Sequence, residues 1–309
     1  IAPSDNIPVF AWLRLRGRCR TCHLPISIQY PLVELAVGLV FLAVYFVEFS
    51  IGCSNLPGSP DAPPGIGLVW TSVTPTLGIR VLLFLIVLSG LIAAALMVAR
   101  HARPPLALFA WILLVVGLGE AVFPATVIVP WWPTSPSWLP DVPSLRSLVK
   151  LVLGLVAGLL TAMLTEPFLR PRCERLAWYG VVACLGTLLG WQAVASATCC
   201  VLLISLIASA AVRTALLATR KPAPQPNALE LEEPPAWDRP WPSWLGDPVV
   251  WSWLGLLVFR AHWKSIESVL RGPESGSPWL MLELSILALV PLAWLVGRGQ
   301  TQRRDNRLQ

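Results

Sequence analysis

The sequence predicts an all-α protein, a polytopic bundle of transmembrane helices with a short cytoplasmic segment at its start. Hydrophobic residues make up 55% of the 309 residues and charged residues only 13%, and the mean hydropathy is +0.67. Several apolar runs approach or exceed the roughly 18 residues that cross a bilayer. Because the backbone in lipid must satisfy its own hydrogen bonds, runs of this length are expected to be helical.

The net charge of +6 reflects membrane topology rather than nucleic-acid binding. Most of the 23 Lys and Arg residues lie in short clusters at the ends of apolar runs. Residues 1–30 carry Arg14, Arg16, Arg18 and Arg20. The positive-inside rule places this segment in the cytoplasm and predicts no nucleic-acid partner.

Residues 31–220 are predicted to form a membrane core of six spans. After the first span, the loop Gly52–Ile79 contains no Lys or Arg, so we expect it outside the cytoplasm. The next basic clusters, at Arg100 and at Arg170, then fall on the cytoplasmic side. The predicted spans are Pro31–Phe49, Val81–Val98, Leu106–Val129, Leu148–Leu164, Leu176–Val194 and a sixth that ends near Arg213.

The C-terminal third is predicted to contain a linker and one or two further spans. Residues 221–240 are rich in Pro and acidic residues and are expected to form a cytoplasmic linker. In residues 241–309, the run Trp279–Val296 is a span followed by a basic tail, which requires an even number of crossings. The run Trp241–Phe259 would supply the missing crossing. Asp247 and Pro248 within it leave an interfacial helix as the alternative.

Three motif-bearing stretches give the chain a resemblance to a known family. Residues 5–34 read DNIPVFAWLRLRGRCRTCHLPISIQYPLVE, residues 94–105 read AALMVARHARPP, and residues 183–194 read ACLGTLLGWQAV. In order and spacing these resemble the prepilin leader peptidase/N-methyltransferase family, whose signature also contains a carboxylate matching Glu34. The resemblance extends over about Asp5 to Arg220. It identifies the chain as a divergent member that lacks the family's N-terminus.

Cys19 and Cys22 have the spacing of half a zinc site. Two thiolates separated by two residues can bind one ion from a tight turn, but structural zinc takes four ligands. The resemblance implies a zinc-ribbon-like segment with a further CxxC pair upstream. Zinc is thus the candidate metal, and a pair of cytosolic thiols without metal is the alternative.

The family's catalytic residues are not found where the resemblance places them. Its members are intramembrane aspartic endopeptidases, in which two carboxylates share a proton and activate water at the cytoplasmic membrane border. Counting from the matching motifs puts the two aspartate positions at Val98 and Trp178. Glu166 and Glu174 are the weak substitute candidates. Nearby arginines could instead pair with them: Arg170, Arg172 and Arg175.

The resemblance therefore predicts a bacterial inner-membrane protein that lacks the family's catalytic aspartates at their expected positions. The family removes the leader of type IV prepilins and type II secretion pseudopilins, and many members N-methylate the new N-terminus with S-adenosylmethionine. We expect a degenerate member, in which S-adenosylmethionine is a cofactor only if methyl transfer is retained. The alternative is a non-catalytic pilin-binding or regulatory membrane scaffold. A transporter is disfavoured because neither an inverted repeat nor paired broken helices can be seen.

Overall fold

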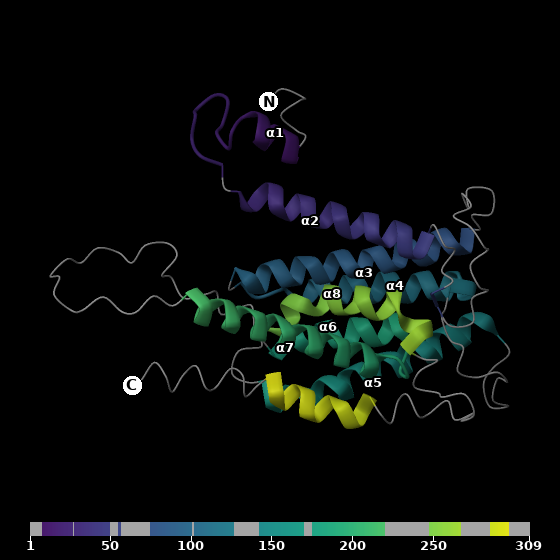
Figure 1. The fold of residues 1–309 in the computed structure, drawn as a ribbon. Coiled ribbons are helices and arrows are strands. Elements are labelled where there is room, and N and C mark those ends of the chain that lie inside the picture. Colours follow the sequence, from purple (N-terminus) through teal and green to yellow (C-terminus); the bar gives the residue numbers. More distant parts are fainter. Residues whose placement is uncertain are drawn as a thin grey trace. The chain divides into compact units, whose positions relative to one another are not determined.

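The computed structural model describes nine stretches of the chain, and within them the regular structure is helical (Figure 1). The stretches are residues 8–26, 28–49, 55–56, 75–100, 102–126, 142–169, 175–219, 247–266 and 285–296. They divide between two compact units, one formed by Ile1–Ser54 with Asp61–Val73 and the other by Asn55–Pro60 with Thr74–Gln309. The predicted linker at 221–240 lies outside the described residues. The all-α, polytopic membrane fold is confirmed.

The first unit contains helix α1 (Pro8–Arg14) and helix α2 (Gln29–Val44), which contact each other. The helical path of α2 continues as a π-helix, η2 (Tyr45–Phe49). The predicted end of the first span at Phe49 therefore agrees with the structure. Its predicted start at Pro31 is two residues late, because Gln29 and Tyr30 are already helical. Glu34 consequently lies in the second turn, where the helix dipole stabilises a carboxylate less than in the first.

The second unit is a helical bundle. Its helices are α3 (Pro75–Ala99), α4 (Leu106–Val122), α5 (Pro143–Leu169), α6 (Arg175–Leu189), α7 (Val194–Thr219), α8 (Pro248–Ala261) and a C-terminal helix, Ser285–Val296. Helix α5 packs on α6, and α8 packs on both α3 and α7. At the α5–α6 contact, Gly154 and Gly158 face Gly186, so the two backbones approach closely.

Three of these helices are long and apolar enough to cross a membrane: Pro75–Ala99, Leu145–Leu169 and Val194–Ala211. Shorter apolar helices lie at Val33–Val44, Leu106–Val122, Arg175–Leu189, Pro248–Ala261 and Ser285–Val296. A described helix thus overlaps each of the six predicted spans. For the shorter helices, and for the orientation of the bundle, crossing stays a prediction.

Among the other boundaries that differ from the sequence prediction are the start of α3 and the end of α4. Helix α3 begins at Pro75 rather than Val81, which places Arg80 inside the helix instead of at its edge. Pro75 can start the helix because the missing N–H of proline has no role in a first turn. Helix α4 ends at Val122 instead of continuing to Val129, and a short 3-10 turn, η4 (Pro124–Thr126), follows. Pro124 cannot donate the next helical hydrogen bond.

Asp247 and Pro248, which made the run Trp241–Phe259 ambiguous, form the beginning of α8. Asp247 is the N-cap: its side chain accepts a hydrogen bond of 2.9 Å from the backbone N–H of Val249. Pro248 is the first helical residue, a position that proline favours. Asp247 and Pro248 therefore begin the helix rather than interrupting it.

Candidate functional site

The two positions at which counting from the motifs predicted the family's catalytic aspartates, Val98 and Trp178, lie on contacting helices, α3 and α6. Val98 is in the last turn of α3 and is buried. Trp178 is in the first turns of α6 and is fully buried. Its indole N–H donates a 2.9 Å hydrogen bond to the Thr165 hydroxyl, which itself donates to the carbonyl of Thr161 at 2.8 Å. Neither Val98 nor Trp178 can exchange a proton in an acid–base reaction.

Glu166, one of the two substitute candidates, has the arginine partner that the sequence suggested. The Nε of Arg175 at the start of α6 lies 2.9 Å from Oε1 of Glu166 near the end of α5. The glutamate side chain is 12% exposed and the arginine 58% exposed. Glu166 and Arg175 therefore form an ion pair between the end of α5 and the start of α6. Glu174, the other candidate, lies outside the described residues together with Arg170 and Arg172.

Cys19 and Cys22 lie on one tight turn that follows α1. The backbone N–H of Cys19 donates to the Leu24 carbonyl at 2.9 Å, and the N–H of His23 donates to the Cys19 carbonyl at 3.0 Å. His23 closes the turn with a left-handed φ of 58°. The Cys22 side chain is exposed and Cys19 is half-buried.

This turn supplies two of the four ligands that a structural zinc ion takes. Within the described ranges, no cluster of three or more His, Cys, Asp or Glu residues could hold a metal ion. The residues present therefore fit half of the predicted zinc site, and zinc stays a prediction.

The turn is fastened to α1 by contacts around Trp12. The Trp12 indole donates to the Ile26 carbonyl at 3.0 Å, and the Ile26 N–H donates to the Gly17 carbonyl at 2.7 Å. Gly17 has φ 69°, and a Cβ there would lie 3.0 Å from the Trp12 ring. Glycine is thus required at this position both for its backbone conformation and for its size.

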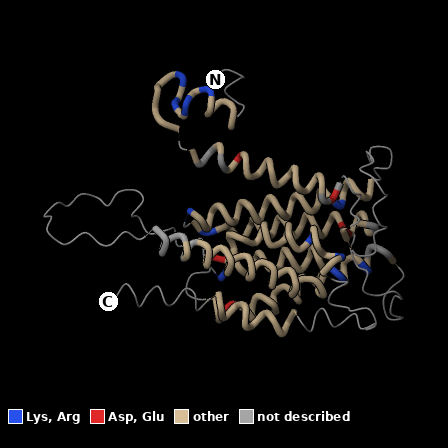
Figure 2. Tube along the Cα trace, viewed as in Figure 1, with Lys and Arg blue, Asp and Glu red and all other residues tan. Residues whose placement is uncertain are grey.

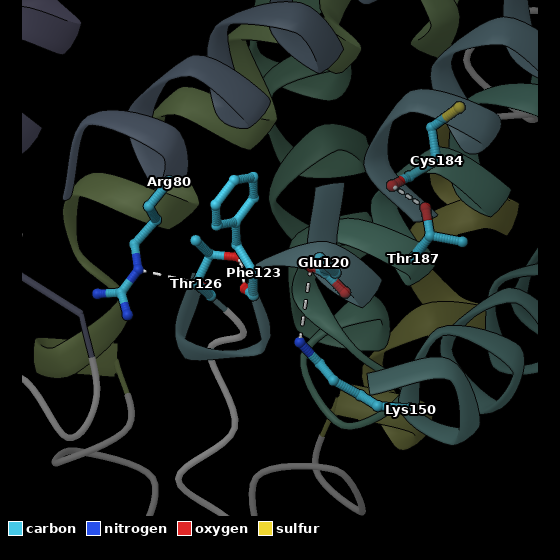
Figure 3. A network of polar contacts seen from close by, with 7 residues as sticks. All are labelled: Arg80, Glu120, Phe123, Thr126, Lys150, Cys184 and Thr187. Carbon is cyan, nitrogen blue, oxygen red and sulfur yellow. Dashed lines mark hydrogen bonds and ion pairs between the residues drawn. The ribbon is translucent and has the colours of Figure 1, made fainter. Parts of the chain in front are cut away.

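Sequence reasoning missed a buried ion pair in the second unit (Figure 3). Nζ of Lys150, near the start of α5, lies 3.9 Å from Oε1 of Glu120, near the end of α4, and both side chains are almost completely buried. In the described part of the chain, Nζ of Lys150 and Oε2 of Glu120 make no hydrogen bond. Beside this pair, Nε of Arg80 donates to the carbonyl of Thr126 at 3.2 Å.

A signal for this pair was present in the sequence. Glu120 and Lys150 are opposite charges near facing ends of two consecutive apolar runs, and such charges in membrane helices generally pair within the bundle. At 3.9 Å, the pair is a charge contact rather than a short hydrogen bond. We assign it a structural role.

Comparison with known proteins places a similarity in the first unit. Residues 1–48 match the family model described as the bacterial peptidase A24 N-terminal domain. Over 43 residues, the chain is 63% identical to a prepilin leader peptidase/N-methyltransferase of Pectobacterium carotovorum subsp. carotovorum, an alignment that covers 14% of this chain and 15% of the relative. It is 62% identical over 43 residues to a protein of the same description from Myxococcus xanthus (strain DK1622), with 14% and 13% covered.

A third relative is the type 4 prepilin-like proteins leader peptide-processing enzyme of Escherichia coli O78:H11, 56% identical over 43 residues, with 14% of this chain and 16% of the relative covered. The chain thus matches only about one seventh of the length of these relatives. No solved structure matches. The resemblance drawn from residues 5–34 is therefore confirmed, and the first 48 residues are similar to the bacterial peptidase A24 N-terminal domain and to that part of prepilin leader peptidases.

Proposed function

We propose that this chain is a degenerate prepilin-peptidase-like protein of the bacterial inner membrane, which binds prepilins or pseudopilins without cleaving them by an aspartic mechanism. Its similarity to prepilin leader peptidases over the first 48 residues supports the class of substrate. Helices long and apolar enough to cross a membrane support the location.

The single observation behind the proposed loss of cleavage is the environment of Trp178. Aspartic catalysis requires two carboxylates close enough to share one proton and reach one water molecule. Trp178 is instead packed in the bundle interior and hydrogen-bonded to Thr165. Helices α3 and α6, which carry the two family positions, contain no Asp or Glu at all. Glu166 is engaged by Arg175.

A cleavage and binding assay with the purified chain tests this proposal. We expect the detergent-solubilised protein to leave a type IV prepilin intact while retaining it in a pull-down. A processed pilin, which lacks the leader, is the binding control. Leader removal would contradict the proposed loss of cleavage, above all if Glu174→Gln abolishes it and Glu166→Gln preserves it. Absence of any prepilin-dependent retention would contradict the binding role.

We further propose that Cys19 and Cys22 contribute two thiolates to a structural zinc site, completed by the second CxxC pair that the resemblance implies. When bound, zinc would supply cross-linking of the segment rather than catalysis. The turn that presents both thiols supports this assignment. The purified full-length protein should contain zinc in an elemental analysis, and Cys22→Ser should lose it while Cys184→Ser, a change of a buried thiol in α6, should retain it.

A further inference from the structure

The first unit carries large apolar side chains and arginines on its surface within a short stretch of chain. Phe10 is 73% exposed, Leu13 60% and Leu24 65%. Four arginines of the same stretch are exposed as well: Arg14, Arg16, Arg18 and Arg20. We call these seven residues the N-terminal patch. Large exposed apolar side chains beside charges of one sign are characteristic of surfaces that bind proteins or membranes.

Local structure fixes the patch on the surface. In α1, Phe10 lies three and four residues before Leu13 and Arg14, so these three side chains share one face of the helix, while Ala11 is buried. The hydrogen bond from Trp12 to the Ile26 carbonyl connects α1 to the turn that carries Leu24. Helix α1 and the turn are therefore held together as one structural unit.

The charge of the patch has one sign. Between Pro8 and Ile28 the sequence contains no Asp or Glu, and the next acidic residue along the chain is Glu34 in α2. Figure 2 shows this stretch with basic positions only. Four like charges so close together repel one another and attract an anionic surface.

The chain leads from the patch directly into an apolar helix. Helix α2 begins at Gln29, contacts α1, and continues through η2 to Phe49. Several of the exposed side chains on this helix are themselves large and apolar, including Leu35, Leu39 and Phe46, as expected for a helix surrounded by lipid. The patch thus precedes a predicted membrane span, which would give it a high effective concentration at the bilayer surface.

We propose that the N-terminal patch binds anionic lipid headgroups at the membrane surface, with Phe10, Leu13 and Leu24 inserted at the level of the headgroups. Arginines beside exposed aromatic and aliphatic side chains are the composition of interfacial anchors. An acidic protein partner would match the arginines. An acidic partner would not explain why the same stretch exposes large apolar side chains and leads directly into α2, a predicted membrane span.

Hydrogen–deuterium exchange of the full-length chain in nanodiscs tests the proposal. Discs of phosphatidylcholine alone are compared with discs that also contain phosphatidylglycerol, in the absence of any pilin. We expect backbone amides of residues 9–26 to exchange severalfold more slowly in the anionic discs, and added salt to reduce this difference. Equal exchange in the two kinds of disc would overturn the proposal.

Matched variants separate charge from fold. Replacing Arg14, Arg16, Arg18 and Arg20 by Gln should abolish the dependence on phosphatidylglycerol. Replacing Arg298, Arg303, Arg304 and Arg307 of the C-terminal tail by Gln removes the same charge and should preserve it. Phe10→Ser with Leu13→Ser should speed exchange in both discs, while peptides of α3 and α5 stay unchanged. Protection that survives the first variant, or that arises only when an acidic protein is added, would likewise overturn lipid binding.

Discussion

At the scale of single residues, the contact between Glu120 and Lys150 is expected to make each residue strongly dependent on the other. Both are buried, so removal of one charge leaves the other without compensation in a low-dielectric interior. Glu120→Gln or Lys150→Met alone should lower the free energy of unfolding by about 3–5 kcal/mol. The double variant should recover a large part of that loss, because no isolated charge remains.

This prediction is checked by reversible unfolding of the purified protein in mixed micelles, analysed as a double-mutant cycle. Glu166→Gln is the matched control. Its arginine partner is largely exposed, so this change should cost less than about 1 kcal/mol. Additive losses in the Glu120→Gln/Lys150→Met variant would show that the two residues do not interact energetically.

Trp178 is the second residue whose environment gives a quantitative expectation. Thr165→Val removes the acceptor of the buried indole N–H without changing the side-chain volume much. It should therefore cost about 1–3 kcal/mol, the price of one buried unsatisfied donor. Trp178→Phe removes the donor but leaves a cavity where the indole was. The Thr165→Val/Trp178→Phe variant should therefore lose less free energy of unfolding than the sum of the losses in the two single variants. Unfolding free energies of the three variants measure this coupling.

At the scale of elements, the existence and order of the helices could be predicted, but several boundaries and contacts could not. The apolar runs identified a helix in every predicted span, because a helix satisfies the backbone hydrogen bonds that lipid cannot. In the early part of α3, Arg80 donates to the Thr126 carbonyl 46 residues away, a contact that no local pattern contains. Asp247 and Pro248 did carry a local signal, that of an N-cap followed by a first-turn proline.

For the same reason, only some contacts of the candidate site could be predicted from the sequence. Arg175 was recognised as a partner of Glu166 because the two are close in sequence, whereas Lys150 was not recognised as the partner of Glu120, which lies on another helix. Trp178 was located by counting from a motif. Its burial and its hydrogen bond to Thr165 depend on how α5 packs on α6, which residue patterns alone do not determine.

The packing of α5 on α6 should be highly sensitive to a single added methyl group. A Cβ on Gly186 would overlap the backbone carbonyl of Gly154, which no side-chain rotation can relieve. Gly186→Ala should therefore destabilise the protein by about 1–3 kcal/mol through a forced separation of the helices. Gly78→Ala in α3 is the matched control, since its Cβ would meet nothing within 4 Å. It should be neutral or stabilising by about 0.5–1 kcal/mol, because alanine is the better helix former. Thermal denaturation of both variants decides between these outcomes.

At the scale of the whole molecule, contacts near the C-terminal end of α8 and along its length favour a membrane crossing over an interfacial helix. Near its C-terminal end, the Arg260 carbonyl accepts a 2.8 Å hydrogen bond from the side chain of Asn55, and the Lys264 N–H donates to the Asn55 carbonyl. Asn55 belongs to the loop predicted outside the cytoplasm. Along its length α8 packs between α3 and α7, and Val249, Leu256 and Phe259 are fully buried.

The C-terminal helix then returns the chain to the side on which α8 begins. Its first residue, Ser285, is hydrogen-bonded to Ser196 in the first turn of α7. Helix α7 begins next to Gly190, whose neighbour is the Lys150 side chain near the start of α5. The start of the C-terminal helix is thus at the end of the bundle that also holds the Glu120–Lys150 pair, and the helix leads away from that end to Val296.

Reporter fusions test this topology directly. Fluorescent protein, which matures only in the cytoplasm, and alkaline phosphatase, which is active only outside it, are fused after Lys221, after Arg271 and after Gln309. If α8 and the C-terminal helix form a crossing pair, fluorescence is expected after Lys221 and Gln309, and phosphatase activity after Arg271. An interfacial α8 would give fluorescence after Arg271 and phosphatase activity after Gln309. That reversed pattern would contradict the crossing pair, because the basic tail would then lie on the side that the positive-inside rule disfavours.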